Sequence, residues 1–258
     1  YEVSLHLAAN AVQYTVDPSW PKIPSPLFFG TKGGYSEERR AVPQRGADGQ
    51  VVRDRAYADG VSGIAMGADD CVYVFNRGVP PIMVFDREGA YVRGGGEKDV
   101  QGEQMATGWT HSGTVDWDGN VWVIERDGHR ILKFTPALDR AIMQLGTTNE
   151  RGYDATHFNL PNGMLVLRNG NIVVTDGYGN NRVVMFDKDG KFLKQVGKGD
   201  GGPTDKGHGP GEFAQPHKLA VDAEENIYVV DRQNRRIQVF DRDLNYLRHY
   251  GRDEWVPW

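Results

Sequence analysis

Three side chains of this sequence have types and positions suited to metal binding and proton transfer. His111 and His217 each stand at the start of a repeated strand pattern, two repeats apart, and Tyr178 lies between Gly177 and Gly179 in a turn of the repeat between them. Neutral imidazole is a natural zinc ligand, and three protein ligands with one water form a catalytic zinc site. The two histidines therefore predict part of a zinc site. A metal-free pair that lines a polar channel is the alternative.

Tyr178 and two arginines form a second group of candidates. Flanking glycines let the backbone approach a ligand and leave the ring exposed. A zinc ion and two arginines nearby would lower the phenol pKa, so that Tyr178 could take a proton from a substrate hydroxyl. Arg77 and Arg232 lie at strand ends and could each hold a substrate carboxylate bidentately. The alternatives are a turn aromatic that packs on a loop and two plain surface arginines.

Composition argues against several classes of protein. The chain has 258 residues and a formal net charge of -5, which argues against a nucleic-acid or anionic-membrane partner. No apolar run approaches the roughly 18 residues of a membrane span. The single cysteine, Cys71, lies in an apolar strand, so we expect a buried, inert thiol and no intrachain disulfide. No Ser-His-Asp or Cys-His set is apparent.

Four copies of a strand–turn–strand pattern organise the chain. The clearest copy is residues 171–197, NIVVTDGYGNNRVVMFDKDGKFLKQVG. A marker phenylalanine recurs at intervals of roughly fifty residues, as Phe85, Phe134, Phe186 and Phe240. Twisted sheets of this kind cannot bury both faces alone, and radial stacking solves the problem. The repeats predict an all-β fold with almost no helix, a β-propeller of four-stranded antiparallel blades.

The predicted propeller occupies residues 61–258, with blades at about 61–96, 111–146, 162–197 and 217–251. Residues 1–60 are predicted to be an N-terminal closing strand and loop segment, because prolines crowd 18–26 and charges crowd the polar stretch after it. The sequence starts at Tyr1 and not at Met. We therefore expect a processed N-terminus and a secreted or periplasmic protein.

The fourth repeat, GEFAQPHKLAVDAEENIYVVDRQNRRIQVFD, resembles the NHL repeat. The Asp and Arg of this motif can pair in the turn between the second and third strands and bind neighbouring backbone groups. Asp231 with Arg236, and Asp176 with Arg182, are the matching pairs here.

Three stretches carry a narrower resemblance, to peptidyl-α-hydroxyglycine α-amidating lyase and its bacterial relatives. They are VSGIA (61–65) leading into VFNRG (74–78), DGY (176–178) leading into GKF (190–192), and PHKLA (216–220) leading into DRQN (231–234). The resemblance spans roughly residues 60 to 250 and implies a six-bladed propeller, of which four blades are visible. It also implies a channel zinc on three histidines, a nearby calcium, and cleavage of a carbinolamide N–C bond that releases a peptide amide and glyoxylate.

The resemblance assigns roles residue by residue. They are His111 and His217 as zinc ligands, the backbone carbonyls of Ile64 and Gly113 as calcium ligands, Tyr178 as the general base, and Arg77 and Arg232 as the groups that bind the substrate carboxylate. The family's third zinc histidine comes from its last blade, which is not among the four repeats. The third ligand could therefore come from further blades, another chain or the N-terminal segment. Gly179 and Val239 stand where animal lyases carry disulfide cysteines, as in the bacterial relatives.

We therefore expect a metal-dependent, lyase-like propeller enzyme that acts on a small carboxylate-bearing carbinolamide, with Tyr178 as base and zinc in the channel. The alternatives are a non-catalytic NHL-repeat scaffold for a protein or ligand, and a calcium-dependent hydrolase or lactonase. The expected partner is a small-molecule or peptide substrate. The ring is expected to be either a truncated six-bladed propeller or one completed by another chain.

Overall fold

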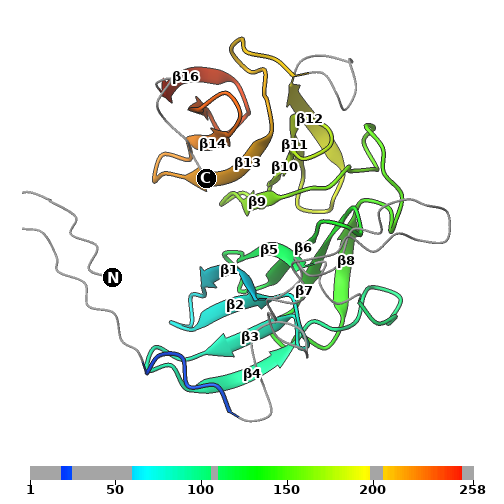
Figure 1. Cartoon of the computed structure of the whole chain (residues 1–258), viewed down its shortest axis with the longest axis vertical. Coiled ribbons are helices and arrows are strands. Elements are labelled where there is room, and N and C mark those ends of the chain that lie inside the picture. Colours follow the sequence, from blue (N-terminus) through cyan, green and yellow to red (C-terminus); the bar gives the residue numbers. More distant parts are fainter. Residues whose placement is uncertain (1–18, 25–59, 106–109, 198–205, 252–258) are drawn as a thin grey trace, which may run out of the picture.

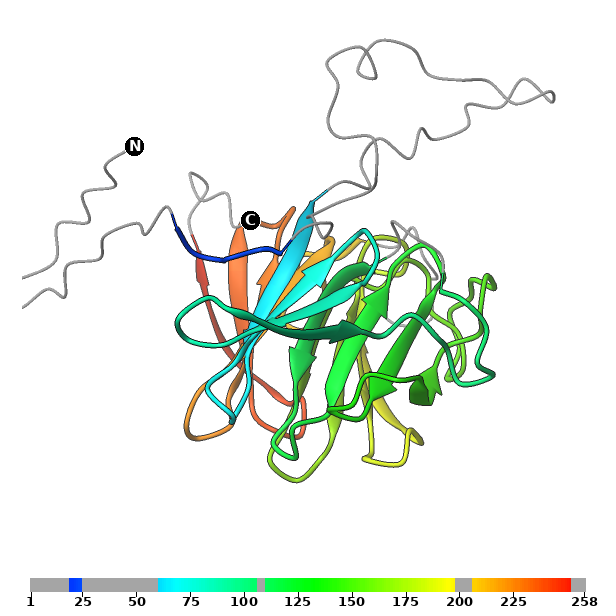
Figure 2. The same ribbon diagram turned by 90° about the horizontal axis from the view of Figure 1, so that it is seen from below.

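All regular structure in the described part of the protein is β-strand. The computed structural model describes residues 19–24, 60–105, 110–197 and 206–251. They form four antiparallel sheets of four strands, each connected in simple chain order. Figure 1 shows the sheets in an arc with the first strand of each innermost, and Figure 2 shows the same strands from a view turned by 90°. The prediction of an all-β propeller with four-stranded blades is confirmed.

Sixteen strands make up the four blades. The first blade contains β1 (Val61–Met66), β2 (Val72–Asn76), β3 (Ile82–Phe85) and β4 (Tyr91–Gly95). The second contains β5 (Thr110–Val115), β6 (Val121–Glu125), β7 (Arg130–Phe134) and β8 (Ala141–Leu145). The third contains β9 (Gly163–Val166), β10 (Ile172–Asp176), β11 (Arg182–Phe186) and β12 (Phe192–Gly197). The fourth contains β13 (Pro216–Val221), β14 (Ile227–Asp231), β15 (Arg236–Phe240) and β16 (Tyr246–Gly251).

The hydrophobic core lies between the blades. One cluster joins the first and second blades, a second joins the second and third, and a third joins the third and fourth. The marker residues Phe134, Phe186 and Phe240 each belong to the cluster that their blade shares with the preceding one. Removing such a buried ring costs about 3–5 kcal/mol. The recurring phenylalanine therefore has a repeated packing role.

The first blade has no preceding blade among the described residues, and a short N-terminal segment covers its marker phenylalanine. Trp20 and Ile23 pack on the cluster that contains Phe85, with the Trp20 and Phe85 ring centroids 5.9 Å apart. Lys22 forms a parallel bridge to Ala90, and this segment is dark blue beside the first blade in Figure 1. The rest of the predicted 1–60 segment lies outside the described residues.

Buried ion pairs close the turns between second and third strands. Asp176 accepts a hydrogen bond from Arg182 Nε at 3.0 Å, and Asp231 accepts one from Arg236 Nε at 2.8 Å. Arg182 also donates to the carbonyls of Tyr153 and His157 in the preceding connection. The predicted pairs are confirmed, and they tie each blade to the chain segment that enters it.

The second blade has an equivalent ion pair with a glutamate in place of the aspartate, and the sequence analysis did not predict it. Glu125 occupies the position of the aspartates, and it accepts a hydrogen bond from buried Arg130. Arg130 also pairs with Asp99 at 3.0 Å.

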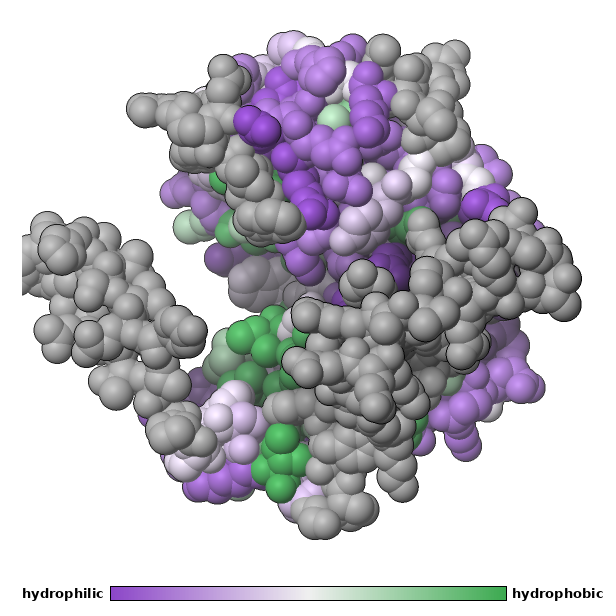
Figure 3. All heavy atoms as spheres, viewed as in Figure 1, coloured by the Kyte–Doolittle hydropathy of each residue, from purple (hydrophilic) through white to green (hydrophobic). Residues whose placement is uncertain are grey.

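Apolar side chains gather over the first blade on the face shown in Figure 3, and hydrophilic ones over the fourth. On β1, Val61, Ile64 and Met66 are exposed.

Cys71 is half-buried beside the first core cluster, where burial raises the pKa of its thiol. Among the described residues, no helix is long and apolar enough to cross a membrane.

Candidate active site

The Tyr178 turn can be built only with glycine on both sides of the tyrosine. A Cβ at Gly177 would lie 1.7 Å from the carbonyl oxygen of Pro216, and one at Gly179 would lie 2.2 Å from Cγ of Asn159. Real Cβ atoms do not approach other atoms so closely, so the third blade presses directly against the start of β13. This contact holds Tyr178 beside the fourth blade.

The two histidines occupy equivalent β-bulges. In the second blade Thr110 pairs with Glu125 while Ser112 pairs with Ile124, which leaves His111 as the extra residue. The fourth blade has the same kind of register shift between Pro216 and Leu219, and His217 lies within it. Because a bulge re-aims the side chain of the extra residue, both imidazoles can face the same point of the channel.

His111, Tyr178 and His217 form one hydrogen-bonded cluster that joins three consecutive blades. The Tyr178 hydroxyl lies 3.2 Å from His111 Nε2 and 2.7 Å from His217 Nε2. The three rings meet edge to face, with centroids 5.3 to 5.9 Å apart. The structure therefore brings together the two predicted zinc ligands and the predicted base.

One phenol proton cannot serve both imidazoles in the same way. A hydroxyl donates once, so Tyr178 donates to one Nε2 and accepts from an N–H on the other. The two histidines must then be opposite tautomers. Both Nδ1 atoms are buried and have no hydrogen-bond partner among the described residues.

Both imidazoles are neutral at pH 7. Burial, followed by the charges of Lys218 and Arg126, lowers the pKa of His111 to about 3. Burial, followed by Lys218 and Arg232, lowers the pKa of His217 to about 4. Neutral imidazole is the form that accepts protons and binds metals.

Burial and the neighbouring arginines shift the pKa of Tyr178 in opposite directions. Burial raises it, and the charges of Arg126, Arg232 and Arg77 oppose that rise without reversing it. The arginine charges act in the predicted direction, but burial outweighs them because a tyrosinate loses its hydration. The lowered phenol pKa predicted for a tyrosine beside zinc stays a prediction. At pH 7 the side chain is a neutral phenol.

Three arginines, and not two, surround Tyr178. Arg77 follows Asn76 at the end of β2, and Arg232 follows Asp231 at the end of β14; the charges of both act on the phenol. Arg77 is half-buried, and its Nε donates to the Thr110 carbonyl at 3.4 Å. Arg126 was missed, although it follows the last residue of β6 and so holds the same place in its blade. Its guanidinium carbon lies 5.9 Å from the Tyr178 ring centroid.

Lys218 and Ser112 are further channel residues that the sequence reasoning missed. Lys218 Nζ donates to Ser112 Oγ at 2.8 Å, across from the fourth blade to the second. Burial lowers the pKa of Lys218. The only available signal was that each residue directly follows one of the channel histidines.

The residues present fit zinc in kind and supply two of the three usual ligands. Two neutral imidazole nitrogens converge, and catalytic zinc sites use three protein ligands. Among the described residues, no group of three or more His, Cys, Asp or Glu side chains could hold a metal. The two predicted calcium ligands, Ile64 and Gly113, lie on the inner strands β1 and β5, which contact each other. Ile64 is 69% exposed. Gly113 packs so closely on the Phe75 ring that an added Cβ would clash with it. Their role as calcium ligands stays a prediction.

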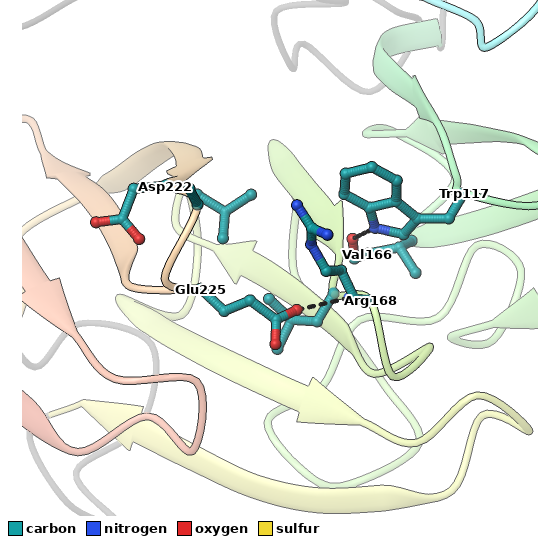
Figure 4. A pocket seen from close by; sticks show the side chains of 8 residues that line it. Trp117, Val166, Arg168, Asp222 and Glu225 are labelled. Carbon is teal, nitrogen blue, oxygen red and sulfur yellow. Dashed lines mark hydrogen bonds between the residues drawn. The ribbon is translucent and has the colours of Figure 1, made fainter.

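A hollow of about 180 Å³ lies elsewhere, at the turns that join first and second strands (Figure 4). Trp117 and Arg168 line it, with the Arg168 guanidinium carbon 4.9 Å from the Trp117 ring. The backbone N–H of Arg168 donates to Glu225 Oε1 at 2.7 Å. The histidines stand at the opposite ends of the inner strands. This hollow and the His–Tyr–His cluster are therefore separate features.

Comparison with known proteins places the chain in a family. A protein family described as "6-bladed beta-propeller" matches residues 119–253. The chain belongs to this six-bladed β-propeller family. The described residues form four blades of the propeller.

Similar proteins include enzymes and NHL-repeat proteins. The propeller is 35% identical over 136 residues to a Caenorhabditis elegans protein named probable peptidyl-alpha-hydroxyglycine alpha-amidating lyase, with 52% of this chain and 37% of that protein covered. It is 30% identical over 253 residues to human NHL repeat-containing protein 3, with 90% of this chain and 58% of that protein covered. The chain thus spans less than two thirds of either relative.

A solved structure of virginiamycin B lyase from Staphylococcus aureus has the same fold. It matches with a TM-score of 0.54 and 18% identity, over 76% of this chain and 56% of that one. This likeness supports the propeller architecture alone.

Proposed function

We propose that this propeller is a lyase-like enzyme that cleaves the N–C bond of a small, carboxylate-bearing carbinolamide. The observation that carries the proposal is the Tyr178 hydroxyl held between His111 Nε2 and His217 Nε2 inside a group of arginines. The nematode relative named as an amidating lyase supports the substrate class.

The reaction needs a proton shuttle and no redox partner. The substrate hydroxyl loses its proton, its C–O bond becomes a carbonyl, the C–N bond breaks, and the nitrogen takes up a proton. Tyr178, once deprotonated, would accept the hydroxyl proton and pass it to the departing amide nitrogen, so that the proton taken from the substrate returns to the product. His111 and His217 would keep the phenol oxygen in place beside the metal that they hold.

Arg77 and Arg232 hold the substrate carboxylate in this proposal. Their charges both act on Tyr178, so a carboxylate bound to them would lie close to the phenol. Guanidinium groups bind carboxylates bidentately and fix their orientation. The scissile carbon, next to that carboxylate, would then face the Tyr178 hydroxyl.

The proposal includes one zinc and one calcium ion, each bound by residues of this chain. His111 and His217 would hold zinc, and the carbonyls of Ile64 and Gly113 would contribute to calcium. When bound, zinc would polarise a substrate oxygen and lower the Tyr178 pKa.

The test combines elemental analysis with turnover of an N-acyl-α-hydroxyglycine, followed by glyoxylate release. We expect bound zinc, and a loss of about 10²- to 10⁴-fold in kcat for Tyr178→Phe, the usual contribution of a positioned acid–base group. His217→Ala should lose both metal and turnover. Wild-type turnover in both variants would overturn the proposal.

A binding scaffold is the second candidate. The match to NHL repeat-containing protein 3 extends over 90% of this chain, and no activity is stated in that protein's name. Stable binding of a carboxylate ligand without turnover would favour it. A calcium-dependent hydrolase would need an acidic cluster in the channel, and the described residues hold no such group.

A further inference from the structure

The third arginine, Arg126, differs from the other arginines of its blade in how it is paired. Its Nη2 and Nε donate to the two carboxylate oxygens of the next residue, Asp127, at 2.7 and 3.2 Å. Both side chains are about one third exposed, at 31% and 33%. Arg130, by contrast, is buried between Glu125 and Asp99. Exposed pairs contribute little to stability, so the Arg126–Asp127 pair can open at small cost.

Arg126 and Arg77 lie close enough for their charges to act on each other. After burial, the Arg126 charge is the largest cause that lowers the pKa of Arg77, and the Asp127 charge opposes it. The Asp127 carboxylate therefore acts on both guanidinium groups, by hydrogen bonds to Arg126 and by its charge on Arg77. A carboxylate has about four lone-pair sites and can accept from two guanidinium groups at once.

The position of Arg126 relative to Tyr178 completes the geometry. Its guanidinium carbon faces the Tyr178 ring at 5.9 Å, and its charge is the first of the three that act against the rise of the Tyr178 pKa. A carboxylate on Arg126 would thus lie beside the hydroxyl that the two histidines hold.

We propose that Arg126 is a carboxylate-binding, specificity-determining residue, and that Asp127 occupies its guanidinium until a ligand carboxylate replaces it. The ligand class is a small α-hydroxy carboxylate, which Arg126 would bind together with the Arg77 and Arg232 of the proposed function. The inference rests on the proposed function for the identity of the ligand. It predicts effects of opposite sign for two neighbouring residues, which a structural role would not produce.

The experiment is an NMR titration of the full chain with glycolate, with the uncharged isostere glycolamide as the matched ligand. Wild type should bind glycolate more tightly than glycolamide. Arg126→Gln should weaken glycolate binding about tenfold, the usual scale for a charged hydrogen bond, and Arg126→Lys should be intermediate. Asp127→Asn should tighten glycolate binding about two- to fivefold, the scale of an exposed ion pair.

Arg140→Gln is the control, because Arg140 is an exposed arginine of the same blade, and it should bind glycolate like wild type. Unchanged glycolate affinity in Arg126→Gln would overturn the inference, and so would Asp127→Asn weakening binding as Arg126→Gln does. Folding of each variant is checked by circular dichroism, and Arg126→Lys serves if Arg126→Gln does not fold.

Turnover is measured separately. Arg126-dependent glycolate binding without turnover would refute the lyase and leave this site standing. Turnover together with unchanged binding in Arg126→Gln would do the reverse.

Discussion

Acid should destabilise this propeller through the two channel histidines, over a defined range of pH. Their pKa values in the folded protein are about 3 for His111 and about 4 for His217, whereas an unfolded histidine titrates near about 6.5. Below that value both histidines are protonated in the unfolded chain but stay neutral in the folded protein. The unfolding free energy therefore has its full value above about pH 6.5, and it falls as the pH drops toward the pKa values of the folded protein.

The size of this effect follows from the linkage relation. At pH 5 each unfolded histidine gains about 2 kcal/mol from protonation, and the native imidazoles stay neutral, so the pair costs at most about 4 kcal/mol of unfolding free energy. Burial and the neighbouring Lys218, Arg126, Arg232 and Arg77 all oppose protonation in the native state. No carboxylate is among the causes that shift either pKa.

The assay is urea unfolding at pH 7 and pH 5, followed by circular dichroism in the presence of a chelator, so that bound cations do not compete with protons. The double variant His111→Gln/His217→Gln should lose about 4 kcal/mol less than wild type between the two pH values. His249→Gln, at an exposed histidine, should keep the wild-type dependence. If the unfolding free energy of wild type and of the double variant fell by the same amount between pH 7 and pH 5, the neutral, buried histidine pair would be refuted.

Three further predictions concern the fold around the site. Arg182→Ala should lower the unfolding free energy by about 3–5 kcal/mol, because it strands buried Asp176; a loss below 1 kcal/mol in urea unfolding would contradict the buried pair. Phe240→Ala should cost about 3–5 kcal/mol in the same assay, whereas exposed Leu247→Ala should cost much less. Gly177→Ala should displace the Tyr178 turn, seen as lost Tyr178–histidine contacts by NMR, and unchanged contacts would refute the close approach to Pro216.

Much of the architecture could be predicted from the repeats. Strand alternation, the recurring phenylalanine and the Asp–Arg pairs are local patterns, and the phenylalanines and the pairs recur at the same places in the blades. The Glu125–Arg130 pair was not predicted, because a glutamate stands at the position of the aspartate. The packing of Trp20 on Phe85 was not predicted, because the two residues lie far apart in the chain.

Part of the candidate site was also predictable. His111, His217 and Tyr178 were found from their places in the repeats, since equivalent places in radial blades meet near one axis. Arg126 could have been found in the same way, from its place after β6. The rise of the Tyr178 pKa by burial could not be predicted, because charges can be counted in a sequence and loss of hydration cannot.

The sequence by itself thus determined the blade pattern and which residue types reach the channel. Only the tertiary structure decided how they meet: the bulges that aim both imidazoles at one phenol, the glycine contact that presses the Tyr178 turn against Pro216, and the opposite tautomers that follow. The physical reason is that periodicity is a local property of the chain. Burial and the summed field of distant charges exist only after the blades have come together.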